Sequence, residues 1–369
     1  MKFIKKNKNL IIAALIILVV LFVFIYTNKD NSDESGKKII STKNDAKFKI
    51  VENSVSKLKL EDYSNDVFSM KKPTGWEVTS AGSGMYYAIR VTDKNDTNNG
   101  IFLMLKIQPL LKSDASKNYW QWYSNLSGNR YKLFADAVVL SNPTTEGFYQ
   151  KFNEIASYIN SIEPTLSSFK FPSYTNFSKV EEFESSSSMK QYSLDSKVLK
   201  GKFTGENNKN GEGLFMASIV NFGDNFINGI DTLYYMVYDI MSVTASENEF
   251  IDYKDILLES INSINFSDTY VKKTIDDGNA QTKQALELNA AVQKAFDSYM
   301  SAWENRNKTY DIMSQKQSDA TLGYERVYDT ETGDIYKAYN GFTDDYDGER
   351  YKSVTDNMYA EKTSGYIDK

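Results

Sequence analysis

An unbroken apolar run near the N-terminus constrains this chain more than any other feature. Leu10 to Tyr26 read LIIAALIILVVLFVFIY, and no charged residue occurs between Lys8 and Lys29. A helix rises about 1.5 Å per residue, so roughly 20 residues cross the hydrocarbon core of a bilayer. We therefore predict a transmembrane helix over residues 10–27, preceded by a short tail at residues 1–9.

A cleaved secretory signal is the alternative interpretation of the same run. The apolar region of such a signal has about 7–15 residues and ends near a cleavage site with small residues. This run is longer, and the TNKDNSDES that follows has no small-x-small pattern. The chain has no cysteine, so it has no residue for a lipoprotein anchor. We expect an uncleaved helical anchor.

The charges beside the run predict its orientation. Lysine occupies positions 2, 5, 6 and 8 before it, whereas Lys29 is followed by Asp30, Asp33 and Glu34. An excess of lysine marks the cytoplasmic flank of a membrane helix. We expect a single-pass protein of the cell membrane, with a cytoplasmic N-terminus and an extracytoplasmic bulk. An exported chain without disulfides is more typical of a bacterial cell surface than of a eukaryotic secreted module.

The overall charge limits the partners. The formal net charge is −6, and it becomes −10 when the four lysines before the run are left out. Such a surface repels nucleic acid. We expect contact with the membrane through the N-terminal helix, an envelope protein or a cell-wall component as partner, and no nucleic acid.

Composition divides the rest of the chain. Residues 28–60 are polar and have no aromatic side chain before Phe48, as in a linker that cannot bury a core. The remaining residues, roughly 300, exceed one typical domain. We predict an α+β fold of antiparallel-sheet modules covered by helices. The predicted modules are residues 61–165, a second α+β module at residues 166–268, and a C-terminal helix with an aromatic, acidic hairpin at residues 276–369.

Periodicity places strands and helices in these modules. Ile101, Leu103, Leu105 and Ile107 recur at the two-residue period of a strand, which predicts that they share one face. The tetrapeptide INSI occurs at residues 159–162 and again at 261–264, each time at the end of a predicted helix. This repetition suggests a duplication with a period of about 100 residues.

The segment FSMKKPTGWEV, at residues 68–78, followed by strands and a closing helix IASYINSI, resembles the opening and close of PsbP-like domains. The resemblance covers about residues 62–165, with a possible degenerate second copy to residue 267. It implies an antiparallel sheet covered by helices. No functional residue is transferred by it.

Composition also excludes several chemistries. The chain has neither histidine nor cysteine, which removes the usual general base, thiol catalysis and ordinary structural zinc. The motifs SSMK at 187–190, SEN at 246–248 and KTSG at 362–365 follow the order of penicillin-recognising enzymes. However, a serine interrupts the last motif, and SSMK lies in a polar serine run. A carboxylate-dependent cell-wall glycan hydrolase remains the enzymatic alternative, because it needs only two suitably spaced acids.

The segment GYERVYDTETGDIYKAYNGF, at residues 323–342, combines acids with aromatic residues. Alternating aromatic and apolar residues flank DTETGD, which predicts a β-hairpin with solvated acids and a glycine turn at Gly333. The spacing does not fit a standard calcium loop. A looser calcium site remains open, and its candidate ligands are Asp329, Glu331, Asp334, Asp345 and Asp347.

A helical pattern precedes this hairpin. Val292, Phe296, Tyr299 and Trp303 recur on one helical face, and we expect that face to pack on the hairpin. Together these observations predict a membrane-anchored extracytoplasmic protein that binds or scaffolds at the bacterial cell envelope, with no catalytic residue and no cofactor beyond a possible calcium ion.

Overall fold

The computed structural model describes residues 49–52, 58–185, 187–247, 249–276 and 308–368. These residues form a mixed α+β fold with several antiparallel sheets, as the sequence predicts. The predicted transmembrane helix and the helix with Phe296, Tyr299 and Trp303 lie outside the described residues. Within the described ranges, none of the helices combines the length and the apolar character needed to span a bilayer.

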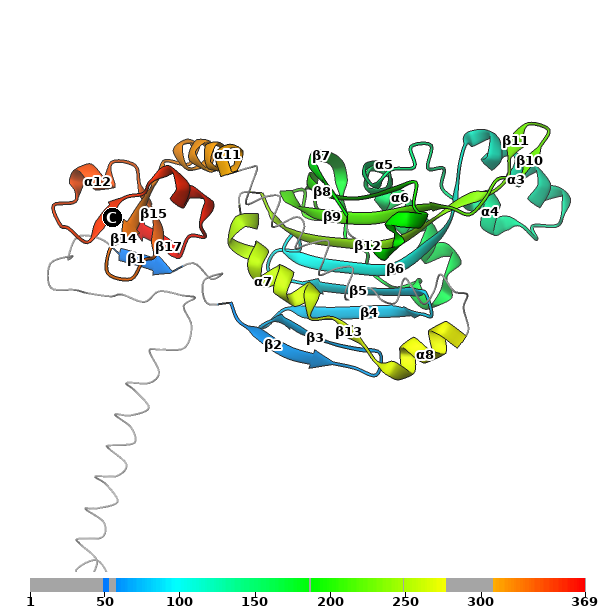
Figure 1. Cartoon of the computed structure of the whole chain (residues 1–369), viewed down its shortest axis with the longest axis horizontal. Coiled ribbons are helices and arrows are strands. Elements are labelled where there is room, and N and C mark those ends of the chain that lie inside the picture. Colours follow the sequence, from blue (N-terminus) through cyan, green and yellow to red (C-terminus); the bar gives the residue numbers. More distant parts are fainter. Residues whose placement is uncertain (1–48, 53–57, 186, 248, 277–307, 369) are drawn as a thin grey trace, which may run out of the picture.

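A seven-stranded antiparallel sheet forms the centre of the molecule (Figure 1). Its strand order is β4-β5-β6-β12-β9-β8-β7. The strands are β4 (Glu77–Ser83), β5 (Tyr86–Thr92), β6 (Gly100–Leu111), β7 (Thr175–Glu184), β8 (Asp195–Thr204), β9 (Asn210–Asn221) and β12 (Tyr234–Ser246). Strand β6 pairs with β12, with Leu103 opposite Met241. The ranges predicted as two α+β modules are therefore halves of one sheet.

Apolar side chains cover both faces of this sheet. On one face, Leu103 and Met241 pack with residues of helix α7 (Phe250–Asn262). On the other face, Phe102 and Ile240 pack with residues of α5 (Thr145–Gln150) and α6 (Phe152–Ile162). Thr144 caps α5 by accepting a hydrogen bond from the Gly147 amide, which fixes where that helix begins.

The predicted strand face of β6 is correct for three of its four residues. Ile101, Leu103 and Leu105 belong to the core beneath α7, but Ile107 belongs to the opposite core. The neighbouring strand β12 stays in register with β6 here, but its register with β9 changes between Tyr238 and Met241. An extra residue in a strand interrupts the alternation of faces, and a two-residue period in the sequence does not reveal it.

A smaller sheet and a helix extend the core beneath α7. The sheet has the order β13-β3-β2. The elements are β2 (Leu60–Ser64), β3 (Phe68–Pro73), β13 (Asn265–Phe266) and α8 (Asp268–Asp276). The chain turns after β3 through Gly75, whose φ is 81°, and Trp76 lies in the core.

The C-terminal residues form a five-stranded sheet of order β1-β17-β15-β14-β16. Its elements are β1 (Lys49–Glu52), α11 (Lys308–Thr321), β14 (Tyr324–Asp329), β15 (Ile335–Tyr339), α12 (Phe342–Asp345), β16 (Tyr351–Ser353), the 3₁₀ turn η5 (Asp356–Ala360) and β17 (Gly365–Asp368). Strands β14 and β15 form the predicted hairpin, with Gly333 at a φ of 82°. Strand β1 lies in the range expected as a linker, yet it pairs with β17.

Candidate functional site: an aromatic arm

One end of the molecule carries a projection that we call the arm. It consists of residues 112–136, with helices α3 (Asp114–Leu126) and α4 (Lys132–Asp136), and residues 222–233, with the short strands β10 (Phe226–Ile227) and β11 (Ile230–Asp231). These elements lie at the right-hand end of Figure 1, and the C-terminal sheet lies at the left. Helix α3 begins where Ser113 accepts a hydrogen bond from the Ser116 amide.

The arm exposes an unusual number of apolar side chains. The described residues include eleven large, exposed apolar side chains, and six of them belong to the arm. Trp122 is 58% exposed and Phe226 is 68% exposed, although side chains of this size usually gain free energy by burial. The six are Trp122, Leu126, Leu133, Phe222, Phe226 and Ile227. Exposed apolar surface concentrated in this way is typical of interaction sites.

Stacked rings hold these side chains in place. Trp120 stacks on Phe134, with ring centroids 4.6 Å apart, and this contact joins α3 to α4. Phe222 stacks on Tyr234 at the same distance, which joins the 222–233 segment to β12. The Trp120 indole also donates a hydrogen bond to the Thr232 carbonyl over 3.0 Å. The surface therefore rests on an ordered aromatic layer.

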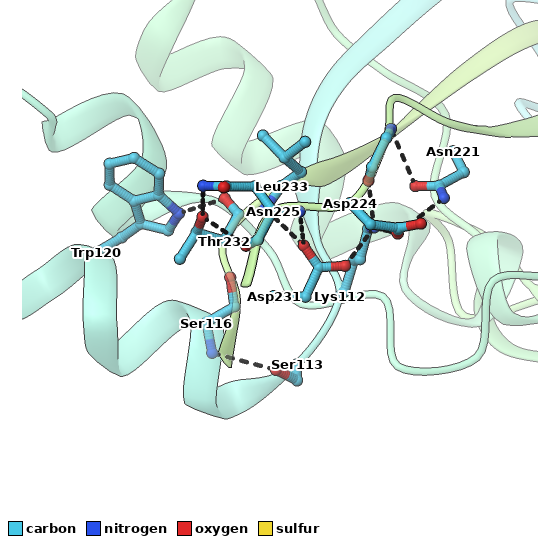
Figure 2. A network of polar contacts seen from close by, with 11 residues as sticks. Lys112, Ser113, Ser116, Trp120, Asn221, Asp224, Asn225, Asp231, Thr232 and Leu233 are labelled. Atoms are coloured by element: carbon cyan, nitrogen blue, oxygen red, sulfur yellow. Dashed lines mark hydrogen bonds and ion pairs between the residues drawn. The ribbon is translucent and has the colours of Figure 1, made fainter. Parts of the chain in front are cut away.

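A polar network around Lys112 fixes the base of the arm (Figure 2). The Lys112 ammonium donates to the Gly223 carbonyl at 2.5 Å, to Oδ1 of Asp224 at 2.7 Å and to Oδ2 of Asp231 at 2.6 Å. The other carboxylate oxygen of Asp231 accepts hydrogen bonds from the amides of Asn225 and Leu233. One lysine thus holds both ends of the segment that carries Phe226.

The electrostatics of this network favour its charged form. Burial raises the pKa of Asp231, but hydrogen bonds from Lys112 and two backbone amides outweigh it and lower the pKa overall. Hydrogen bonding to Lys112 also lowers the pKa of Asp224. Burial by itself lowers the pKa of Lys112. The hydrogen bonds to the two carboxylates have the larger combined effect, so the pKa of Lys112 is raised overall. The network therefore stays ionised at neutral pH.

The arm has no net formal charge, in contrast to the acidic chain as a whole. Residues 112–136 and 222–233 contain four basic and four acidic side chains. The basic ones are Lys112, Lys117, Arg130 and Lys132, and the acidic ones are Asp114, Asp136, Asp224 and Asp231. The arm therefore has no net charge to attract a strongly charged partner, and its exposed apolar side chains are the main groups available for contact.

The five candidate calcium ligands lie in the C-terminal module, but they do not converge. Asp329 accepts hydrogen bonds from Arg350 and from the Glu331 amide. Asp334 accepts from the Ser364 hydroxyl at 2.9 Å, whereas Asp345 accepts from the Tyr339 hydroxyl at 3.2 Å. Asp347 is exposed in the loop after α12. Within the part of the chain that the structure describes, no three acids are grouped as metal ligands.

The prediction that the hairpin acids are solvated is wrong for Asp329. Its side chain is fully buried, and it forms an ion pair with Arg350 at 2.8 Å. Burial raises the pKa of Asp329, but the bonds from Arg350 and from two amides outweigh it and lower the pKa overall. Asp329→Asn should therefore destabilise the hairpin, because it removes one partner of a buried pair.

The motif SSMK does not form a nucleophile with its lysine. Ser187 is buried and donates a hydrogen bond to Asp239, while Lys190 forms an ion pair with Glu184 at 2.7 Å. Sequence spacing alone suggested a Ser-Lys pair, but the two side chains have different partners.

Asp239 is a buried carboxylate at the bulge in β12. It is 1% exposed, its φ is 52°, and its Oδ2 accepts hydrogen bonds from Ser187 and Ser218. Burial raises the pKa of Asp239 to about 6. The folded state thus binds a proton more tightly than the unfolded state, so folding stability should fall as pH rises from about 4 to about 6.

Replacement of Asp239 by asparagine should raise stability at pH 7.5 by on the order of 1–3 kcal/mol and remove this pH dependence. Asparagine keeps a carbonyl acceptor for Ser187 and Ser218 and tolerates positive φ. Urea unfolding at pH 5 and pH 7.5 measures the effect. Asp239→Ala is the matched control and should destabilise, because it loses the acceptor. An unchanged pH dependence in Asp239→Asn would contradict the assignment.

Comparisons with known proteins add little to this geometry. No family model matches the chain, and no curated protein matches it significantly. Among solved structures, the chain is similar to cyanobacterial PsbP (CyanoP) from Synechocystis sp. PCC 6803, at 9% identity. The match covers 56% of this chain and 92% of that one, with a TM-score of 0.21. The resemblance to PsbP-like domains therefore corresponds to a weak structural similarity only.

Proposed function

We propose that this chain is a membrane-anchored extracytoplasmic binding protein of the bacterial cell envelope, and that it docks a protein partner through the arm. The observation that carries the proposal is the cluster of six exposed apolar side chains on an arm whose formal charges cancel. Binding sites between proteins are enriched in tryptophan, tyrosine and phenylalanine. The arm has this composition.

The rigidity of the arm supports the same function. The ring stack of Trp120 and Phe134 joins the two helices that carry exposed side chains, and the ion pairs of Lys112 hold the segment that carries Phe226. A preorganised surface loses less conformational entropy on binding than a flexible one. Trp122 and Phe226 are the natural anchors, because they are large, aromatic and exposed.

The membrane anchor in this proposal rests on the sequence. Leu10 to Tyr26 are long and apolar enough to cross a bilayer, and the lysines before them favour an outward-facing bulk. The hydrolase alternative requires two facing acids in a cleft. The pocket between α6 and residues 167–173 is lined by one acid, Glu206, whereas the hydrolase mechanism requires two.

The absence of cysteine from the chain allows one experiment to test both parts. We would place a single cysteine in the full-length protein as Ile227→Cys on the arm or as Val180→Cys on β7. Both native side chains are exposed, so the second variant is the matched control. A membrane-impermeant maleimide added to intact cells should label both variants, because both face outward.

A thiol-directed crosslinker should then capture a second protein with Ile227→Cys and not with Val180→Cys. No labelling of either variant in intact cells, with labelling after lysis, would contradict the outward orientation. Equal capture at both positions, or none at residue 227, would contradict docking through the arm.

A further inference from the structure

A second candidate binding site lies on the helical side of the central sheet, apart from the arm. This pocket is open to solvent and has a volume of about 510 Å³. It is lined by helix α6, residues 167–173 and Glu206. Binding sites for small molecules typically have volumes of about 300–1,000 Å³. The pocket is therefore large enough for a ligand, and the proposed function does not use it.

Neutral hydrogen-bonding side chains dominate the wall of this pocket. Its charged side chains are one base, Lys170, and one acid, Glu206. The ring of Phe171 adds a half-buried apolar surface and packs against Phe102 and Phe169. The neutral polar side chains are Asn153, Ser157, Asn160, Ser167, Ser168 and Ser173.

The wall is held in place by its own hydrogen bonds. The Asn153 side chain donates to the hydroxyls of Ser173 and Thr175 and accepts from the Tyr174 amide. Arg90, which is buried, donates to the carbonyl of Lys170 at 3.0 Å and to Oε1 of Glu206 at 2.5 Å. These bonds fix the backbone of residues 170–175 and the position of the Glu206 carboxylate.

Several polar groups of the wall have no hydrogen-bond partner in the described part of the chain and are available to a ligand. Arg90 occupies only Oε1 of Glu206, and no described residue donates a hydrogen bond to Oε2. The Lys170 ammonium and the Ser168 hydroxyl likewise have no hydrogen bond or ion pair within the described ranges. An acceptor, a cationic donor and a hydroxyl therefore surround one pocket, next to the apolar ring of Phe171.

We propose that this pocket binds one sugar ring of a glycan. The ring's hydroxyl groups would bond to Glu206 Oε2, Lys170 Nζ and Ser168 Oγ, and its C–H face would lie on Phe171. One base among the lining residues is too few for a phosphorylated ligand, which is typically held by several cationic or backbone donors. One acid is too few for a metal. The apolar lining residues are Ala156, Phe169, Phe171 and Pro172, and together they form too small a surface for a lipid chain.

The test is titration of the full-length protein in detergent micelles with two separate probes. The neutral probe is the tetramer of N-acetylglucosamine, and the acidic probe is tetragalacturonate. Saturable binding of at least one probe is expected by calorimetry. Ser157→Trp should weaken it by about tenfold or more, because Ser157 is exposed on α6 and the indole would fill the pocket. Glu154→Trp, on the exposed side of the same helix and outside the pocket, should leave affinity within about twofold.

Glu206→Gln should also weaken binding while keeping an oxygen for Arg90. Trp122→Ser on the arm should leave it unchanged, which separates this site from the proposed protein-docking surface. The absence of saturable binding by both probes, or equal binding by Ser157→Trp and Glu154→Trp, would overturn the proposal.

Discussion

Replacement of Asp319 by alanine should destabilise the C-terminal module by about 3–5 kcal/mol, because it leaves two buried cations without their shared partner. The Asp319 side chain is 2% exposed and accepts from Arg326 Nε at 2.6 Å, and Lys337 Nζ lies 3.2 Å from its other oxygen. The side chain of Arg326 is itself only 1% exposed. Its remaining contacts, including the Gln315 amide oxygen, are neutral and do not replace a carboxylate.

Hydrogen exchange at the β14–β15 amides of the full-length protein measures this effect, because it reports the stability of these two strands directly. Asp356→Ala is the matched control. Asp356 pairs with Lys316 at the surface and is 77% exposed, so its removal should change protection little. Equal loss of protection in both variants would contradict the assignment of Asp319.

The double variant Asp319→Ala with Arg326→Met should recover part of the lost stability, because a buried cation is replaced by an apolar side chain of similar length. Hydrogen exchange at the same amides shows the recovery. Additive losses in the double variant would contradict this account of the ion-pair cluster.

Replacement of Trp120 by alanine should release the β10–β11 segment from helix α3. The change removes the stack on Phe134 and the hydrogen bond to the Thr232 carbonyl, and for a half-buried ring we expect a cost on the order of 2–3 kcal/mol. The loss should be largest in residues 112–136 and 222–233, because both of these contacts join residues of the arm.

Amide exchange in the arm, compared with exchange in β9 and β12, measures this localisation. Trp120→Phe keeps a ring but loses the indole donor, and it should produce a smaller loss. Uniform loss of protection across the arm and the central sheet would show that the arm is not a separate cooperative unit.

The sequence predicts local features of the fold better than strand pairing. The hairpin at residues 323–342 was predicted because glycine at positive φ and alternating side chains are local signals. The pairing of β6 with β12 joins residues more than a hundred positions apart, and alternation does not specify which strands become neighbours. The central sheet therefore had to come from the structure.

Two further features were hidden by weak local signals. Strand β1 is four residues long and lies in a polar range, so composition alone favoured a linker. The burial of Asp329 depends on Arg350, which lies 21 positions later in the chain, and sequence gives no means of pairing them. In both cases a long-range contact decides the local environment.

The amino-acid sequence of the arm contains a pattern that indicates its exposed aromatic surface. The run YWQWY at residues 119–123 places four aromatic residues in little more than one helical turn, so they point to several sides of the helix. One buried face cannot cover all of them, and Trp122 is the ring that remains exposed. Consecutive aromatic residues in a helix thus indicate an exposed surface, whereas aromatic residues spaced by three or four positions indicate a core.

The central claim is that the exposed side chains of the arm dock another protein. The most direct measurement is the yield of the crosslinked complex in intact cells with the double variant Trp122→Ser and Phe226→Ser, with the crosslinking cysteine placed on the arm as Ile227→Cys. The matched control replaces Met313 and Leu322, which are exposed apolar side chains of α11 and the residue after it, by serine. The account predicts that the arm variant loses about nine-tenths of the complex, the tenfold effect expected from removing two anchor side chains, while the control keeps it. Equal yields from the two variants would contradict docking through the arm.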